Sequence, residues 1–80
     1  MSTIRAVQNR ILYFCEERNL TINKMSNIAG IPPSSIKNIL YGKSKNPKII
    51  TIKMICDGLD ITLKEFFDTP EFNALEQEIK

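Results

Sequence analysis

Residues 22–39 read INKMSNIAGIPPSSIKNI, and this stretch decides the fold. Apolar residues recur three and four positions apart on both sides of Gly30, at Met25, Ile28 and Ala29 and again at Ile36, Ile39 and Leu40. That spacing predicts two short helices, each with one apolar face turned inward. Gly30 adopts positive φ without steric cost and can end the first helix, while Pro33 suits the first turn of the second. Two such helices joined by a tight turn form a helix-turn-helix.

Three further helices are predicted around this pair. Ser2 or Thr3 can cap a first helix that runs to about Arg18, and Asn19 tolerates a left-handed helix end. Thr21 is the expected cap of the helix that follows, and Thr62 begins a capping box with Glu65. The predicted inward faces are Ile4, Val7, Ile11, Phe14 and Cys15 in the first helix, Ile49, Ile52, Ile55, Cys56 and Leu59 in the fourth, and Leu63, Phe66 and Phe67 in the fifth.

The expected fold is therefore all-α, a compact five-helix bundle. Its 80 residues make one small domain, and no stretch alternates in the manner of a strand. We place the domain at residues 1–68 and a tail at residues 69–80, where Thr69-Pro70 signals a short sixth helix. Phe72, Leu75 and Ile79 form an apolar stripe in this tail, expected to close over the domain's own core. Docking of a partner chain on the stripe is the alternative.

Several functional classes are disfavoured by what the sequence lacks. It contains no His, no glycine-rich phosphate loop and no nucleophile beside a base, so we expect neither an enzyme nor a cofactor. Cys15 and Cys56 stand far apart among apolar neighbours, which favours reduced core thiols over a disulfide or a metal site. With no run of 18 apolar residues and no signal-peptide pattern in MSTIRA, the expected location is the cytoplasm, not a membrane.

Charge is distributed unevenly along the chain. The net charge is only +2, but residues 24–53 carry six lysines and no acid, whereas residues 54–80 carry seven acids and two lysines. A basic segment is often only a solvated surface. Here it coincides with the second helix of the pair and the loop after it, which favours contact with the phosphates of a nucleic acid.

These features resemble the Cro/repressor-type (Xre-like) helix-turn-helix family of prokaryotic and phage DNA-binding proteins. The resemblance covers roughly residues 11–67 and includes Leu20-Thr21, YGKSKNP at 41–47, TIKMICDGL at 51–59 and ITLKEFF at 61–67. It implies a lambda-repressor-like fold and a transcriptional regulator, in the first place a repressor, that binds a specific double-stranded DNA sequence in the nucleoid. A protein-interaction or antitoxin-like adaptor on the same fold is the alternative.

The resemblance also implies which residues meet DNA. The second helix of the pair would enter the major groove and the first would lie across the backbone. The base-reading candidates are Ser34, Ser35, Lys37 and Asn38. The backbone candidates are Asn23, Pro33, Tyr41, Lys43, Ser44, Lys45 and Lys48. Lysine can donate to guanine, and asparagine can both donate to and accept from adenine.

Two departures from the family concern this surface. Many members have Gln where this chain has Ile22, and a hydroxyl cap where it has Pro32. The prolines leave the amides of Ser34 and Ser35 at the helix start, where they either bind a phosphate or belong to a turn that the prolines merely stiffen. The family also implies a homodimer on DNA, joined through the fifth helix or the tail.

Overall fold

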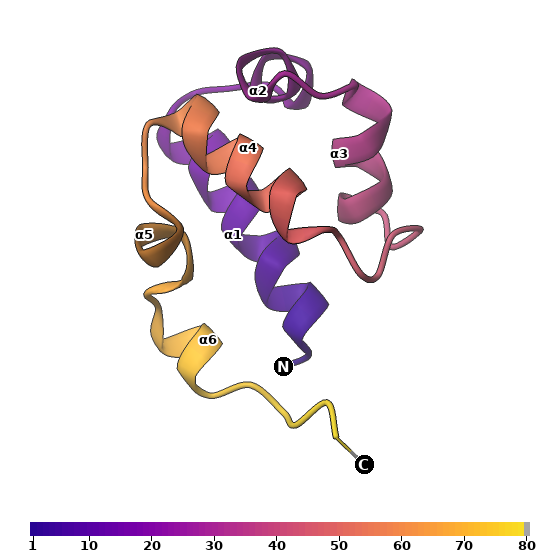
Figure 1. The fold of residues 1–80 in the computed structure, drawn as a ribbon, viewed down its shortest axis with the longest axis vertical. Coiled ribbons are helices and arrows are strands. Elements are labelled where there is room, and N and C mark those ends of the chain that lie inside the picture. Colours follow the sequence, from indigo (N-terminus) through magenta and orange to yellow (C-terminus); the bar gives the residue numbers. More distant parts are fainter. Residues whose placement is uncertain (80) are drawn as a thin grey trace.

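The structure, a computed structural model, describes residues 1–79. That part of the chain contains six helices and no strand: α1 (Thr3–Glu17), α2 (Ile22–Ala29), α3 (Pro33–Leu40), α4 (Ile49–Leu59), α5 (Leu63–Phe67) and α6 (Pro70–Asn73). The helix α4 lies in front of α1, α2 lies over one end of this pair, and α3 stands to the side (Figure 1). The expected all-α bundle with a short sixth helix is confirmed.

Polar caps fix where the helices begin. The hydroxyls of Ser2, Thr21, Thr62 and Thr69 each accept a hydrogen bond from the backbone N–H three residues further on. At the start of α5 the Glu65 carboxylate also accepts from the Thr62 N–H at 3.1 Å, which completes the predicted capping box. These bonds satisfy amides that the first turn of a helix leaves free.

Residues with a left-handed backbone conformation fix where the helices end. Asn19 has a φ of 58° just after α1, and Gly30 a φ of 71° after α2, as the sequence predicts. Gly42 takes a φ of 85° after α3, and Asp60 ends α4 with a φ of 58°, a role that the sequence analysis did not assign to it. Each reversal redirects the chain within a residue or two, so the four longer helices fold back onto one core.

The core lies where the first five helices meet. Its fully buried side chains are Ile11, Met25, Ser26, Ile36, Ile55, Cys56, Leu59 and Phe66. The ring of Phe66 stacks on that of Phe14 with centroids 6.2 Å apart, which ties α5 to α1. Ser26, the buried polar residue of this set, donates to the carbonyl oxygens of Ile22 and Asn23 at 3.0 and 2.8 Å. Its hydroxyl is therefore satisfied within α2.

Two residues predicted on inward faces are exposed instead. Ile28 is 45% exposed because α2 meets α4 through Met25, Ser26 and its own backbone, which turns Ile28 outward. The close approach occurs at Gly58, where an added Cβ would lie 2.5 Å from the Ile28 carbonyl oxygen. Ile49 is 58% exposed because it is the first residue of α4 and lies at the edge of a surface groove.

The tail does not close over the core along its whole predicted stripe. The helix α6 ends at Asn73, and a stripe through residue 79 would need a longer helix. Phe72 packs on the ring of Phe67 with centroids 4.9 Å apart, and Leu75 is half-buried, but Ile79 is 86% exposed. The Glu76 N–H donates to the Met1 carbonyl at 3.3 Å, so the tail runs beside the N-terminus. Lys80 lies outside the described residues.

Candidate nucleic-acid interface

The turn between α2 and α3 holds the two helices at a fixed angle. Gly30 and Ile31 donate their N–H groups back to the carbonyls of Asn27 and Ser26, at 3.2 and 3.1 Å. Pro32 precedes α3 without a side-chain cap, and its carbonyl accepts from the Ser35 N–H at 2.9 Å. The amide of Ser35 is therefore already bonded within the first turn, whereas a phosphate contact at the amide of Ser34 stays a prediction.

The helix α3 has one buried face and one polar face. Ile36 and Ile39 are buried, and Ser34, Lys37, Asn38 and Tyr41 are exposed, the last of these at the residue that ends the helix. Positions three and four apart lie on one side of a helix, so these four residues form a single row. Ser35 and Pro33 are half-buried at the edge of this row. Three of the four base-reading candidates thus point to solvent from one helix.

A residue of α1 that the sequence analysis did not single out supports α3. The side-chain amide of Gln8 donates to the Ile39 carbonyl at 2.9 Å. This carbonyl belongs to the last turn of α3, where no amide of the same helix is left to pair with it. Gln8 therefore holds the end of α3 against α1. The signal in the sequence is an amide side chain next to Val7 in the inward stripe of the first helix.

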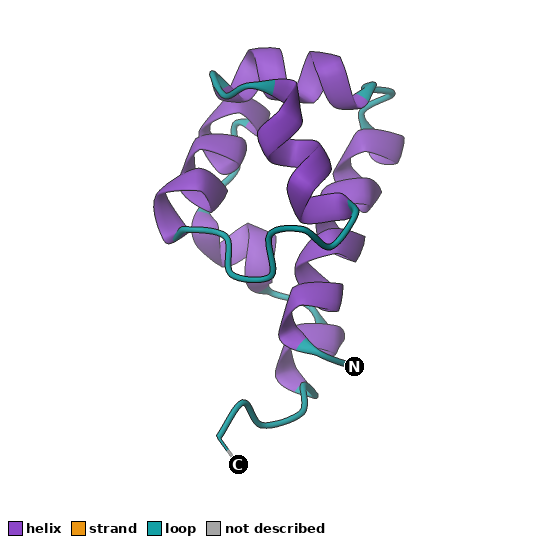
Figure 2. Ribbon diagram, turned by 90° about the vertical axis from the view of Figure 1, so that its right-hand side faces the viewer, coloured by secondary structure: helices purple, strands orange, loops and turns teal. Residues whose placement is uncertain are grey.

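The loop from Tyr41 to Lys48 passes below the end of α3 to the start of α4 (Figure 2). The Ser44 N–H donates to the Asn38 carbonyl at 2.9 Å, which fastens the loop to the helix. A polar cleft of about 310 Å³ lies between loop, α3 and α4, lined by Ser35, Asn38, Ile39, Ser44, Asn46, Pro47, Lys48 and Thr51. Two base-reading and two backbone candidates therefore share one cleft.

The other backbone candidates lie outside this cleft. Lys43 and Tyr41 are exposed beyond the end of α3, and Asn23 is exposed on α2. Lys45 lines a different groove, on the side of the loop that faces α1. The loop thus presents its lysines in more than one direction.

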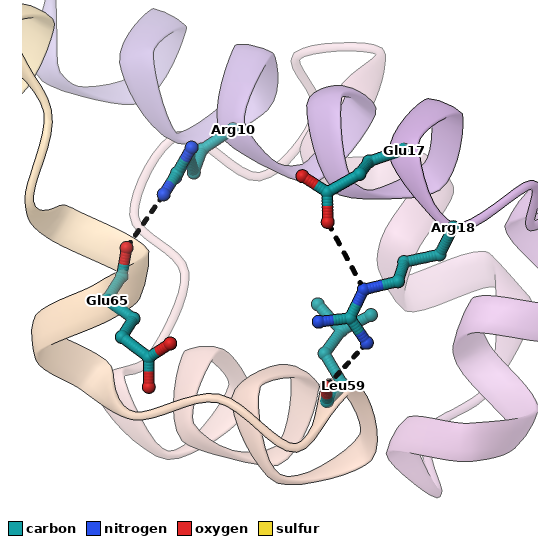
Figure 3. Close-up of polar contacts among 5 residues, drawn as sticks. All are labelled: Arg10, Glu17, Arg18, Leu59 and Glu65. Atoms are coloured by element: carbon teal, nitrogen blue, oxygen red, sulfur yellow. Dashed lines mark hydrogen bonds and ion pairs between the residues drawn. The ribbon is translucent and has the colours of Figure 1, made fainter.

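Two of the three arginines bind the protein's own backbone. Arg10 donates to the carbonyls of Phe66 and Glu65, both at 2.7 Å, and Arg18 donates to the Leu59 carbonyl at 2.7 Å. Figure 3 shows the bonds to Glu65 and Leu59. These carbonyls end α5 and α4, where cations are favourable. Arg18 also pairs with Glu17 at 3.3 Å. These arginines fasten α1 to α4 and α5, and the cations on the α3 side are lysines.

The titratable groups with shifted pKa values lie away from α3. A hydrogen bond between Tyr13 and Glu17 on α1 lowers the pKa of Glu17 and raises that of Tyr13. Burial raises the pKa of the thiols of Cys15 and Cys56, which makes both poor nucleophiles. Both cysteines are free, so their interpretation as core thiols agrees with the structure.

Residues 1–79 hold neither a cluster of metal ligands nor a helix suited to a membrane. No three His, Cys, Asp or Glu side chains of this part gather closely enough to hold a metal ion. None of its helices combines the length and the apolar character that crossing a bilayer requires.

Two short helices joined at a left-handed glycine, the second with a polar face beside a lysine-containing loop, define a helix-turn-helix DNA-binding unit. The sequence profile of the Cro/C1-type HTH DNA-binding domain matches residues 10–71, and the chain belongs to this family. The predicted family is thereby confirmed, although the part that each residue plays in binding DNA stays a prediction.

The fold is shared with a phage-derived protein of known structure. The crystal structure of the prophage Lp1 protein 11 superposes with a TM-score of 0.80 at 34% sequence identity, over 94% of this chain and 100% of that chain. No curated protein matches this chain.

Proposed function

We propose that this protein is a transcriptional repressor that reads a specific DNA sequence with α3. The observation that carries the proposal is the exposed row Ser34, Lys37, Asn38 and Tyr41 on a helix whose other face is buried. A major groove about 12 Å wide accepts one α-helix with its side chains. A row of donors and acceptors on the outer side of that helix then faces the base edges.

Within this row, Asn38 and Lys37 are the central base readers. The backbone of Asn38 is held by the hydrogen bond from Ser44, and the next turn of the helix is held by Gln8. From a backbone placed in this way, the side-chain amide of Asn38 can donate to and accept from one adenine, whereas the Lys37 ammonium can donate to guanine. Ser34 and Ser35 would contact neighbouring bases from the first turn.

The backbone contacts surround the reading helix. Lys43 and Lys48 are exposed on the loop after α3, and Asn23 is exposed on the helix before it. Polar groups on both sides of an inserted helix would meet the phosphates that border the groove, with Tyr41, Ser44 and Pro33 completing the set. This contribution favours any duplex, and the base contacts then select among duplexes.

The same geometry favours two copies on one site. One helix of eight residues spans only a few base pairs, so specificity on a chromosome needs a second reading helix. Two copies related by a two-fold axis would read half-sites about 34 Å apart. Occupying such a site excludes other proteins from it without any further contact, which favours repression over activation.

The test is selection of bound duplexes from a random library, followed by footprinting of the DNA that flanks the protein's own gene. The expected result is a palindromic sequence that the protein protects, with an affinity that falls steeply as salt is added. Equal affinity for selected and scrambled duplexes would contradict sequence-specific binding.

A further inference from the structure

A second concave surface lies between the α3–α4 loop and the tail. It is a groove of about 670 Å³ that the reading helix does not line. Its apolar lining comes from three helices, α1, α4 and α5, and from the loop, through Ile4, Val7, Pro47, Ile49, Ile52 and Phe67. In both ribbon views the first turn of α1 lies between the loop and the tail (Figures 1 and 2). The loop and the tail therefore form the two walls of this groove.

The two walls carry opposite charges. Lys45 stands on the loop side and Glu78 on the tail side. The ion pairs found within residues 1–79 are Arg18–Glu17 and Lys53–Asp57, so neither of these two wall residues has an ionic partner there. Both side chains are exposed.

Exposed isoleucines adjoin the same walls. Ile49 and Ile50 at the start of α4 are 58% and 64% exposed, and Ile79 beside Glu78 is 86% exposed. Covering these isoleucines together with the apolar groove removes apolar surface from water, which lowers the free energy. The groove and its walls therefore have the shape and the composition of an interface that is open in the single chain.

We propose that this groove is the surface through which two copies of the chain associate, with the two-fold axis running along the groove. Such an axis places each loop wall opposite the tail wall of the other copy. In such a dimer the Lys45 of each copy faces the partner's Glu78, which gives two equivalent ion pairs. Each Ile79 is directed toward the apolar lining of the partner's groove. The inference deepens the proposed function, because it names the surface that would join two reading helices.

The charges favour a second copy over another kind of partner. An acidic partner would be repelled by the Glu78 wall, and a basic partner by the Lys45 wall. A two-fold copy of the same groove satisfies both walls at once. Between the two dimer contacts expected from the sequence, the structure favours the tail, since no large apolar side chain of α5 is among the exposed ones.

The test is a charge exchange read by analytical ultracentrifugation of the free protein over a concentration series. Wild type is expected to dimerise, whereas Lys45→Glu alone and Glu78→Lys alone each bring like charges together and should remain monomeric. An equimolar mixture of the two variants restores both attractive pairs, so it should form a heterodimer. Ile79→Asp, which leaves the folded core untouched, should also dissociate the wild-type dimer.

The matched control is Leu12→Glu on α1, a 48% exposed leucine that lines a different surface. It should dimerise as the wild type does. Single charge variants that dimerise normally, or a mixture that stays monomeric, would overturn the assignment of the groove. A wild-type protein that is monomeric yet binds its selected duplex would overturn the dimer surface and leave the proposed function standing. A dimer that prefers no duplex would support the dimer surface and contradict the proposed function.

Discussion

Gly58→Ala should destabilise the fold, although a Gly-to-Ala change inside a helix ordinarily stabilises it. Alanine gains about 1 kcal/mol of helix propensity. Here the added Cβ would lie 2.5 Å from the Ile28 carbonyl oxygen, 2.7 Å from its carbon and 2.9 Å from the Ala29 nitrogen. Ordinary contacts lie at about 3.5 Å, so α2 would have to retreat by roughly 1 Å.

The balance of the two terms sets the expected magnitude. Overpacking against a backbone that cannot rotate away costs up to about 3 kcal/mol, which leaves a net loss of about 2 kcal/mol after the propensity gain. A domain of this size has a free energy of unfolding on the order of 4–12 kcal/mol, so the loss is large. With an m-value of about 1 kcal/mol per molar urea, the midpoint should fall by about 2 M.

Urea unfolding followed by circular dichroism measures this loss. The control is Asp57→Ala at the preceding position, which removes an exposed ion pair with Lys53 and should change stability by less than about 0.5 kcal/mol. A Gly58→Ala variant with a higher midpoint than wild type would show that α2 and α4 do not approach as closely as described. Because α2 and α3 form the DNA-binding unit, the same variant should also bind its duplex less tightly.

Three further predictions concern the loop, a cap and the buried thiols. Lys43→Ala should weaken binding to selected and scrambled duplexes alike and make the log–log salt slope shallower by about 1, as titrations at several salt concentrations would reveal. Thr62→Ala removes the capping box of α5 and should lower the free energy of unfolding by about 1 kcal/mol, in contrast to an unchanged value for the exposed Lys64→Ala. Since burial raises the pKa of the Cys15 and Cys56 thiols, the unfolded chain loses their protons first, and urea midpoints should fall as the pH rises above about 8.5. The fall should be smaller in a variant with both cysteines replaced by alanine, and equal pH profiles for the two proteins would argue against buried thiols.

Local features of the fold could be predicted from the sequence because their causes are local. Thr21 and Thr62 cap helices through bonds to residues three positions away. Gly30 and Asn19 end helices because they tolerate positive φ. The exposed side of α3 follows from the spacing of Ile36 and Ile39, which leaves Lys37 and Asn38 on the other side.

Features that depend on how helices meet could not be predicted in this way. A glycine inside a helix lowers its helix propensity, yet Gly58 permits the contact between α2 and α4 that also turns Ile28 outward. Arg10 and Arg18 bind carbonyls that lie 41 to 56 residues away along the chain. No periodicity in one segment encodes a bond to a segment that far along the chain.

The most direct test of the central claim, that α3 reads base edges in the major groove, is a double-mutant cycle between Asn38 and one adenine. The affinities of wild type and Asn38→Ala are measured by titration for the selected duplex and for the same duplex with 7-deazaadenine, which lacks the N7 acceptor of the major groove. If Asn38 bonds that adenine, the modified base should weaken wild-type binding by about 5-fold to 100-fold and leave the binding of Asn38→Ala unchanged. Replacing each adenine and each guanine of the half-site in turn by its 7-deaza analogue identifies the partner. Equal losses for both proteins at every adenine would contradict the assignment of Asn38, and no loss at any modified purine of the site would contradict major-groove reading by α3.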